Sequence, residues 1–86
     1  MELMENKLIF LEMAEFQFGT FRIILIQEDD RYYVTTGIGS WNDYTFSLKW
    51  CYTFTEYEEA KKCYDAYKAF VLKHGHLKAK DFRYYD

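Results

Sequence analysis

The sequence predicts an α+β fold: a small antiparallel β-sheet of three or four strands in meander order, then one long α-helix packed on one face. Residues 44–55 alternate apolar and polar side chains, as a strand with one buried face does. Residues 56–74 repeat apolar side chains every three or four positions, as an amphipathic helix does. The 86 residues contain no proline and no Ser/Gly-rich stretch, so residues 1–86 are expected to form a single domain.

The first strand is expected over residues 7–18, with a turn at Gly19 and Thr20. Its alternation shifts between Met13 and Phe16, which a β-bulge near Ala14 would explain. A short helix over residues 2–15 is the alternative. That helix would turn four apolar side chains inward: Leu3, Met4, Leu8 and Leu11.

Two further strands are expected over residues 20–27 and 31–36, joined by a tight acidic turn at residues 28–30. The first of them is apolar on both faces, which predicts a central position in the sheet. A loop over residues 36–43 leads into the long strand. The helix is expected to cover the strand face that carries Phe46, Leu48, Trp50 and Tyr52.

The helix has recognisable ends. Thr55 and Glu58 have the spacing of a capping box, and Gly75 is a typical helix terminator. The expected apolar stripe is Tyr57, Ala60, Cys63, Tyr64, Tyr67, Phe70 and Val71. After Gly75, the tail is expected to rejoin the sheet as a short strand that blocks one edge.

Charge is unevenly distributed along a chain whose net charge is −3. Residues 1–43 carry eight acids and three bases, whereas residues 44–86 carry six acids and eight bases. The excess of bases in residues 44–86 can form a solvated surface, or it can contact phosphate or an acidic partner. The candidates for such contacts are Lys73, Lys78, Lys80 and Arg83.

Cysteine usage and the N-terminal residues indicate a cytoplasmic protein. Cys51 and Cys63 are expected to be reduced, packed thiols, because two cysteines in a small domain do not form a disulfide framework. Glu2 and Glu5 stand where a secretory signal would be basic. No apolar run approaches the ~18 residues that cross a bilayer, so no membrane partner is expected.

Residues for catalysis or metal binding are sparse. His74 and His76 lack companion ligands at metal-site spacing, and a strand rather than a helix follows Gly37 and Gly39. Residues 28–30 are acidic but lie in a turn without the surrounding ligands of a calcium loop. We therefore expect no enzyme activity, no catalytic residue, no metal and no cofactor.

Aromatic side chains make up 22% of the chain, more than one sheet face under one helix can enclose. The surplus either covers the edge of the core or forms an interface for another protein or for a second copy of the chain. The interface candidates outside the strongest core patterns are Tyr32, Tyr33, Trp41, Phe82, Tyr84 and Tyr85.

These observations favour a small, non-catalytic protein-binding module. Proteins of this class share its small size and general character. By that analogy alone, we expect a phage or mobile-element inhibitor that occludes a site on a host defence protein. The alternative is a protein that binds single-stranded nucleic acid, because residues 78–85 mix basic and aromatic side chains.

Overall fold

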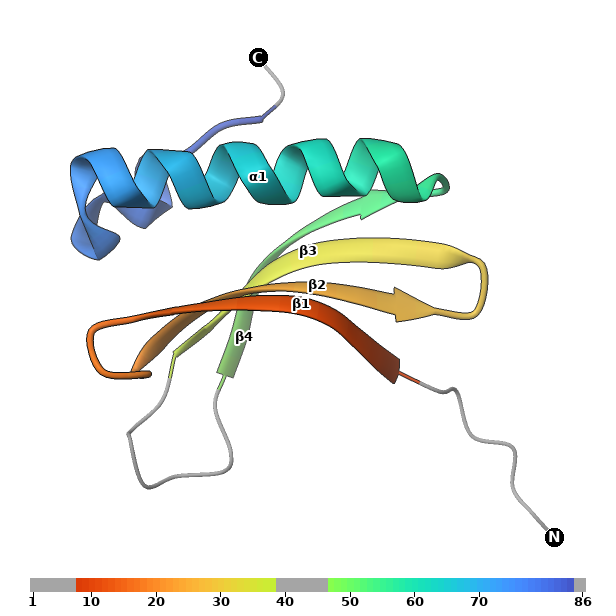
Figure 1. Ribbon diagram of the computed structural model, residues 1–86, viewed down its shortest axis with the longest axis horizontal. Helices are drawn as coiled ribbons and strands as arrows, with labels where there is room; N and C mark the ends of the chain where they lie inside the picture. The colour runs from red at the N-terminus through yellow and green to blue at the C-terminus, as the bar shows by residue number, and fades with distance from the viewer. Residues whose placement is uncertain (1–7, 39–46, 85–86) are drawn as a thin grey trace, which may run out of the picture.

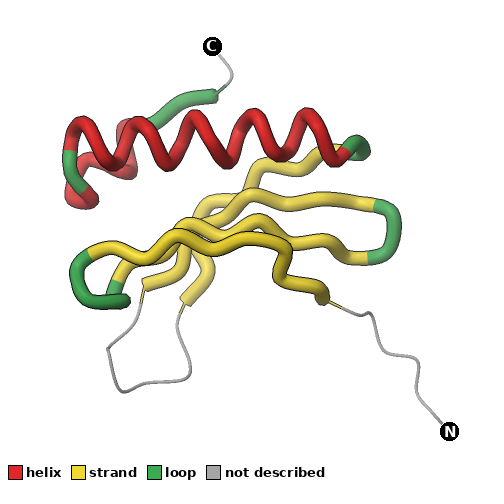
Figure 2. The backbone as a smooth tube through the Cα atoms, viewed as in Figure 1, coloured by secondary structure: helices red, strands yellow, loops and turns green. Residues whose placement is uncertain are grey.

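The protein is described by a computed structural model that covers residues 8–38 and 47–84, with the side chains of residues 38 and 47–51 left out. Four antiparallel strands form one sheet in the order β1-β2-β3-β4, and α1 packs on one face (Figures 1 and 2). The predicted α+β architecture is confirmed. The elements are β1 (Leu8–Phe16), β2 (Phe21–Glu28), β3 (Arg31–Ile38), β4 (Ser47–Phe54), α1 (Tyr57–His74) and the 3₁₀ helix η1 (His76–Asp81).

The strand prediction for the N-terminal segment is confirmed over Leu8–Phe16, and the helical alternative is wrong there; residues 1–7 lie outside the described residues. The predicted bulge near Ala14 is misplaced, because the register shifts between Phe10 and Glu12. The shift lets two successive side chains approach the helix side of the sheet. Leu11 packs against the core, and the Glu12 carboxylate lies 2.7 Å from Lys61 Nζ of α1.

Strand β2 has the predicted central position, between β1 and β3, and is apolar on both faces. Phe21, Ile23 and Leu25 belong to the core under α1. Ile24 and Ile26 are 0% and 4% exposed, although neither belongs to that core cluster.

The helix side of β4 carries Tyr52, as predicted, and the Tyr52 ring lies edge-on to that of Tyr67 at 6.4 Å. The side chains of Leu48 and Trp50, and the whole of Phe46, lie outside the described residues.

The predicted capping box is wrong, and α1 begins one residue later than expected. Glu56 is the N-cap in extended conformation and forms no side-chain capping bond. Thr55 therefore lies one residue too far from the helix for its hydroxyl to reach the N3 amide. The first turn instead gains from Glu58 and Glu59, since acids are favourable near the positive end of the helix dipole.

The stripe buried by α1 matches the prediction at five positions and differs at two. Phe70 is only partly buried, and Tyr57, at the N-terminal end of the helix, is 41% exposed. The buried members are Ala60, Cys63, Tyr64, Tyr67 and Val71. Gly75 ends the helix as predicted: its φ is 95°, and its N–H donates to the Val71 carbonyl oxygen at 2.7 Å.

The prediction that the tail pairs with the sheet is wrong for the described residues 76–84. They form η1 and an extended segment that packs through its side chains. The Phe82 ring stacks on Tyr67 at 4.2 Å, and the Tyr84 ring lies edge-on to Phe54 at 6.0 Å. Aromatic packing thus fixes the tail against α1 and β4. Backbone groups of the tail form hydrogen bonds with nearby residues in and beside η1.

Cys63 is free and buried, which confirms the reduced thiol predicted there; the Cys51 side chain lies outside the described residues. Burial raises the pKa of the Cys63 thiol to about 12. A thiol with so high a pKa forms very little thiolate at neutral pH, so Cys63 is a core residue and a poor nucleophile.

Candidate functional site

Of the six predicted interface aromatics, the four that the structure describes do not share one surface. Phe82 is 7% exposed and belongs to the core cluster, although it lies outside the strongest core patterns of the sequence. Tyr84 is half-buried against Phe54, and Tyr32 is half-buried with its ring edge-on to Tyr57 at 5.9 Å. These rings cover the edge of the core on the helix side, one of the two arrangements that the aromatic surplus predicts.

Tyr33 follows Tyr32 in β3 and therefore points to the opposite face of the sheet. It lines an open polar depression of about 230 Å³ beside the acidic β2–β3 turn. The other two candidates, Trp41 and Tyr85, lie outside the described residues.

The predicted basic candidates are all exposed, at or beyond the C-terminal end of α1: Lys73, Lys78, Lys80 and Arg83. Arg83 also has a structural role. Its Nη1 donates to the carbonyl oxygens of Lys80 at 2.9 Å and Phe82 at 2.8 Å, which ties the tail to the end of η1.

Within residues 8–38 and 47–84, no group of three or more His, Cys, Asp or Glu side chains is placed to hold a metal ion. The His74 ring lies 4.5 Å from Phe70, whereas the His76 ring lies 6.1 Å from Phe21, so the two histidines have different surroundings. Neither α1 nor any other helix within this part of the chain is long and apolar enough to span a membrane.

The most apolar exposed element is β1. Seven of its nine residues are apolar, yet none is buried. Helix α1 packs against β2, β3 and β4, and no described strand pairs with the outer side of β1. Four side chains make up what we call the β1 surface: Leu8 (56% exposed), Ile9 (47%), Phe10 (52%) and Met13 (40%).

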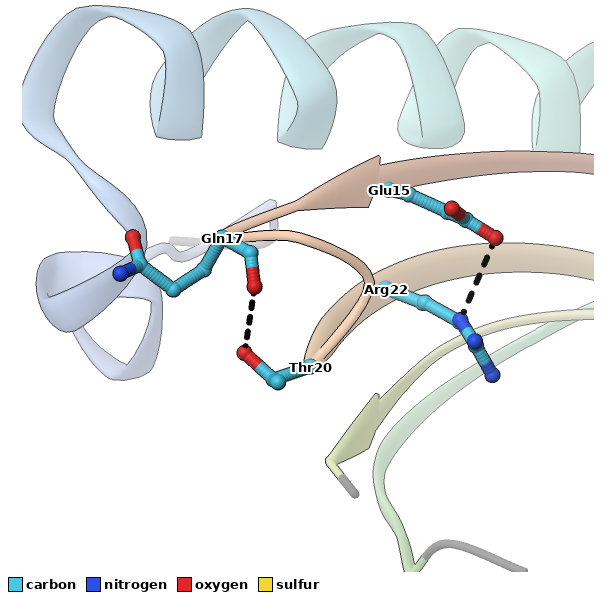
Figure 3. A network of polar contacts seen from close by, with 4 residues as sticks. All are labelled: Glu15, Gln17, Thr20 and Arg22. Atoms are coloured by element: carbon cyan, nitrogen blue, oxygen red, sulfur yellow. Dashed lines mark hydrogen bonds and ion pairs between the residues drawn. The ribbon is translucent and has the colours of Figure 1, made fainter. Parts of the chain in front are cut away.

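Two acids on β1 are engaged by neighbouring bases. The Arg22 Nε atom lies 3.4 Å from Glu15 Oε2 (Figure 3). Lys61 contacts Glu12, and that hydrogen bond is the largest of the effects that raise the pKa of Lys61 to about 12. Exposed charges commonly protect sheet edges against association. On β1 both acids follow the bulge, and the half before it, from Leu8 to Phe10, is entirely apolar.

The β1–β2 turn, the C-terminal end of α1 and η1 lie at the same end of the molecule (Figure 1), and each carries one exposed large apolar side chain. We call these three side chains the end surface: Phe18 (83% exposed), Leu72 (70%) and Leu77 (77%). The contact between Phe21 and His76 joins the strand after the turn to η1. Leu72 follows Lys61 by eleven residues, about three helical turns, and so lies on the flank of α1 nearest β1.

The β1–β2 turn holds Phe18 in an unfavourable backbone conformation. Gln17 and Phe18 have φ values of 52° and 57°, a left-handed conformation that costs roughly 1–2 kcal/mol for a residue other than glycine. Thr20 supports the turn by donating its N–H at 3.1 Å and its hydroxyl at 2.8 Å to the Gln17 carbonyl oxygen (Figure 3). The strained turn thus lowers the stability of the fold at the place where it exposes the Phe18 ring to water. Strained backbone conformations of this kind cluster at functional sites.

Sequence reasoning missed both surfaces because its interface candidates were aromatic residues of the third predicted strand, the loop after it and the tail. Two patterns indicated the end surface. Leu72 falls outside the apolar stripe of the helix, and Leu77 stands among polar and basic residues after the helix has ended.

The chain matches no protein-family model, no curated protein and no solved structure.

Proposed function

We propose that this protein is a non-catalytic protein-binding module whose β1 strand adds to a strand of its partner. The observation that supports the proposal is the state of β1: a nine-residue, mostly apolar edge strand without one buried residue. Such an edge presents backbone N–H and C=O groups to a second chain and is a common site of strand addition.

The side chains of β1 would supply specificity to this pairing. Phe10 and Met13 stand opposite Ile26 and Ile24 in the register, on the sheet face away from α1. Ile9 stands opposite Gln27 and projects to the other face. A partner strand beside β1 would therefore be flanked by apolar side chains on both faces, and its burial would contribute about 25 cal/mol for each Å² of apolar surface removed from water.

A module of this kind covers the sheet edge of its partner. It would occlude any site that lies at that edge. The narrower expectation of a phage or mobile-element inhibitor of a host defence protein, and the cytoplasmic location, stay predictions. Single-strand nucleic-acid binding also stays a prediction. It has less support, because the Phe82 and Tyr84 rings pack in or against the core and are not presented for stacking on bases.

We expect Phe10→Lys and Met13→Lys each to weaken partner binding by about tenfold or more, because each places a charge in an apolar contact. The measurement is capture of partners from an extract of the protein's own host, with half of each sample treated with nuclease. Thr53→Lys is the matched control: it adds the same charge at an exposed position on the opposite edge strand, β4. All three exposed substitutions should change the stability of the fold by less than about 1 kcal/mol.

A stoichiometric protein that survives nuclease, binds wild type and Thr53→Lys, and is lost from both β1 variants is the expected result. Equal capture by all four proteins would contradict the role of β1. Loss of all bound material on nuclease treatment would favour the nucleic-acid alternative. If the partner is a second copy of this chain, sedimentation of the purified wild-type protein will show a dimer that Phe10→Lys dissociates.

A further inference from the structure

We propose that the end surface, defined by Phe18, Leu72 and Leu77, binds an acidic protein segment that carries apolar side chains. This inference concerns a different surface from β1 and does not depend on strand addition. It rests on three observations: the exposure of the three apolar side chains, the charge around them, and the fixed geometry of the turn that carries Phe18.

The three apolar side chains come from three elements that meet at one end of the molecule. Phe18 is 83% exposed, Leu77 77% and Leu72 70%, the three highest values among the exposed large hydrophobic residues in the described part of the chain. Apolar side chains grouped on a surface and bordered by polar residues are typical of interaction sites.

The surrounding charge is strongly positive. Residues 66–84 contain five bases and one acid, Asp81, and the turn at residues 17–20 carries no charge. In a 3₁₀ helix, residues three apart share a side, so Leu77 lies on the same side of η1 as Lys80. Lys68 precedes Leu72 by one turn of α1, and Lys73 follows it directly. Electrostatic complementarity therefore calls for an acidic partner.

A protein segment fits these groups better than an anionic membrane. Lys68 Nζ lies over the Tyr64 ring at 5.4 Å, and Arg83 donates to carbonyl oxygens of the tail. The other three bases, Lys73, Lys78 and Lys80, are divided between α1 and η1, whereas anionic-lipid binding typically uses roughly four to eight bases clustered on one element. The left-handed turn also fixes the backbone at Phe18, and such preorganisation benefits a partner with a defined pocket.

The test uses a fluorescent synthetic peptide of about fifteen residues with glutamate at most positions and leucine every third or fourth residue. The control peptide has glutamine in place of every glutamate. We expect wild type to bind the acidic peptide at least about tenfold more tightly than the control in fluorescence anisotropy, with the difference shrinking as salt increases.

Two variants locate the binding site. The double variant Gln17→Asn/Phe18→Gly keeps residues that favour a left-handed turn, so it should melt at or above the wild-type temperature and yet lose about tenfold or more in affinity. Lys78→Glu should weaken binding of the acidic peptide but not of the glutamine peptide. Thr53→Lys, far from the end surface on β4, is the control and should bind as wild type does.

Equal affinity for the two peptides would overturn the proposal, and so would unchanged binding by a folded Gln17→Asn/Phe18→Gly variant. Phosphatidylserine vesicles and oligothymidylate are tested in parallel. Tighter binding of either one, with the same dependence on Phe18 and Lys78, would replace the protein segment by a membrane surface or a nucleic acid.

Discussion

Tyr67→Ala is expected to lower the free energy of unfolding by about 3–5 kcal/mol, the range for removal of a large buried aromatic side chain. Tyr67 is 1% exposed and contacts both the sheet and the tail. Its ring stacks on Phe82 at 4.2 Å and meets Tyr52 edge-on at 6.4 Å, and its hydroxyl donates to the Ala79 carbonyl oxygen at 3.4 Å. A domain of this size is stable by only roughly 4–13 kcal/mol, so the variant should lose a large part of its stability.

Urea unfolding followed by circular dichroism measures this loss, and Leu72→Ala is the control on the same helix. Leu72 is 70% exposed, so its truncation should cost less than about 0.5 kcal/mol. If Tyr67→Ala cost no more than the Leu72 variant, the joint packing of α1, β4 and the tail around Tyr67 would be wrong.

The protein is expected to lose stability steeply as the pH rises from about 9 to 12. Burial raises the pKa of Cys63 from 9.0 to about 12 and that of Tyr67 from 10.0 to about 12. In this window the unfolded chain loses protons that the folded chain retains. The unfolded state therefore binds fewer protons, and the free energy of unfolding falls as the pH rises.

The size of the alkaline effect follows from about 1.4 kcal/mol for each pKa unit. The thiol contributes up to about 4 kcal/mol and the phenol up to about 3 kcal/mol, which together are a large part of the stability expected for a domain of this size. The pKa of Lys61, also raised to about 12, acts in the same direction, but its contribution is small because the lysine is partly exposed.

Equilibrium unfolding at several pH values between 8 and 12 measures this loss. Cys63→Ala and Tyr67→Phe each remove one titrating group, so each variant should lose less stability between pH 9 and pH 12 than wild type does. A free energy of unfolding that stays constant to pH 12 would show that neither group is buried as described.

The regular parts of the fold were predictable because their sequence periods are unambiguous. The alternation that ends at Phe54 and the helical spacing from Ala60 to Val71 each allow one secondary structure. The predictions that were wrong concern positions where neighbouring residues compete for one structural role. Thr55 is a residue type that favours the helix N-cap, but the chain bends there and Glu56 becomes the N-cap. The bulge lies at Leu11 because both Leu11 and Glu12 have partners on the helix side of the sheet.

The tail shows why the candidate site was harder to predict than the fold. Phe82 and Tyr84 alternate with Asp81 and Arg83 as strand residues would, but the rings are more stable against Tyr67 and Phe54 than beside a sheet edge in water. Whether an apolar side chain is covered depends on where the helix crosses the sheet. Because α1 crosses β2, β3 and β4, four of the apolar residues of β1 remain exposed, and no local sequence pattern predicts this.

Amide hydrogen exchange of β1, measured with and without the captured partner, tests strand addition most directly. In the isolated protein, the outward-facing amides between Leu8 and Phe10 should exchange rapidly, because no described strand accepts hydrogen bonds from them. In the complex, we expect their exchange to slow by about tenfold or more, while exposed amides of the β2–β3 turn at Asp29 and Asp30 are unchanged. A complex that forms while the β1 amides exchange as fast as in the isolated protein would contradict strand addition.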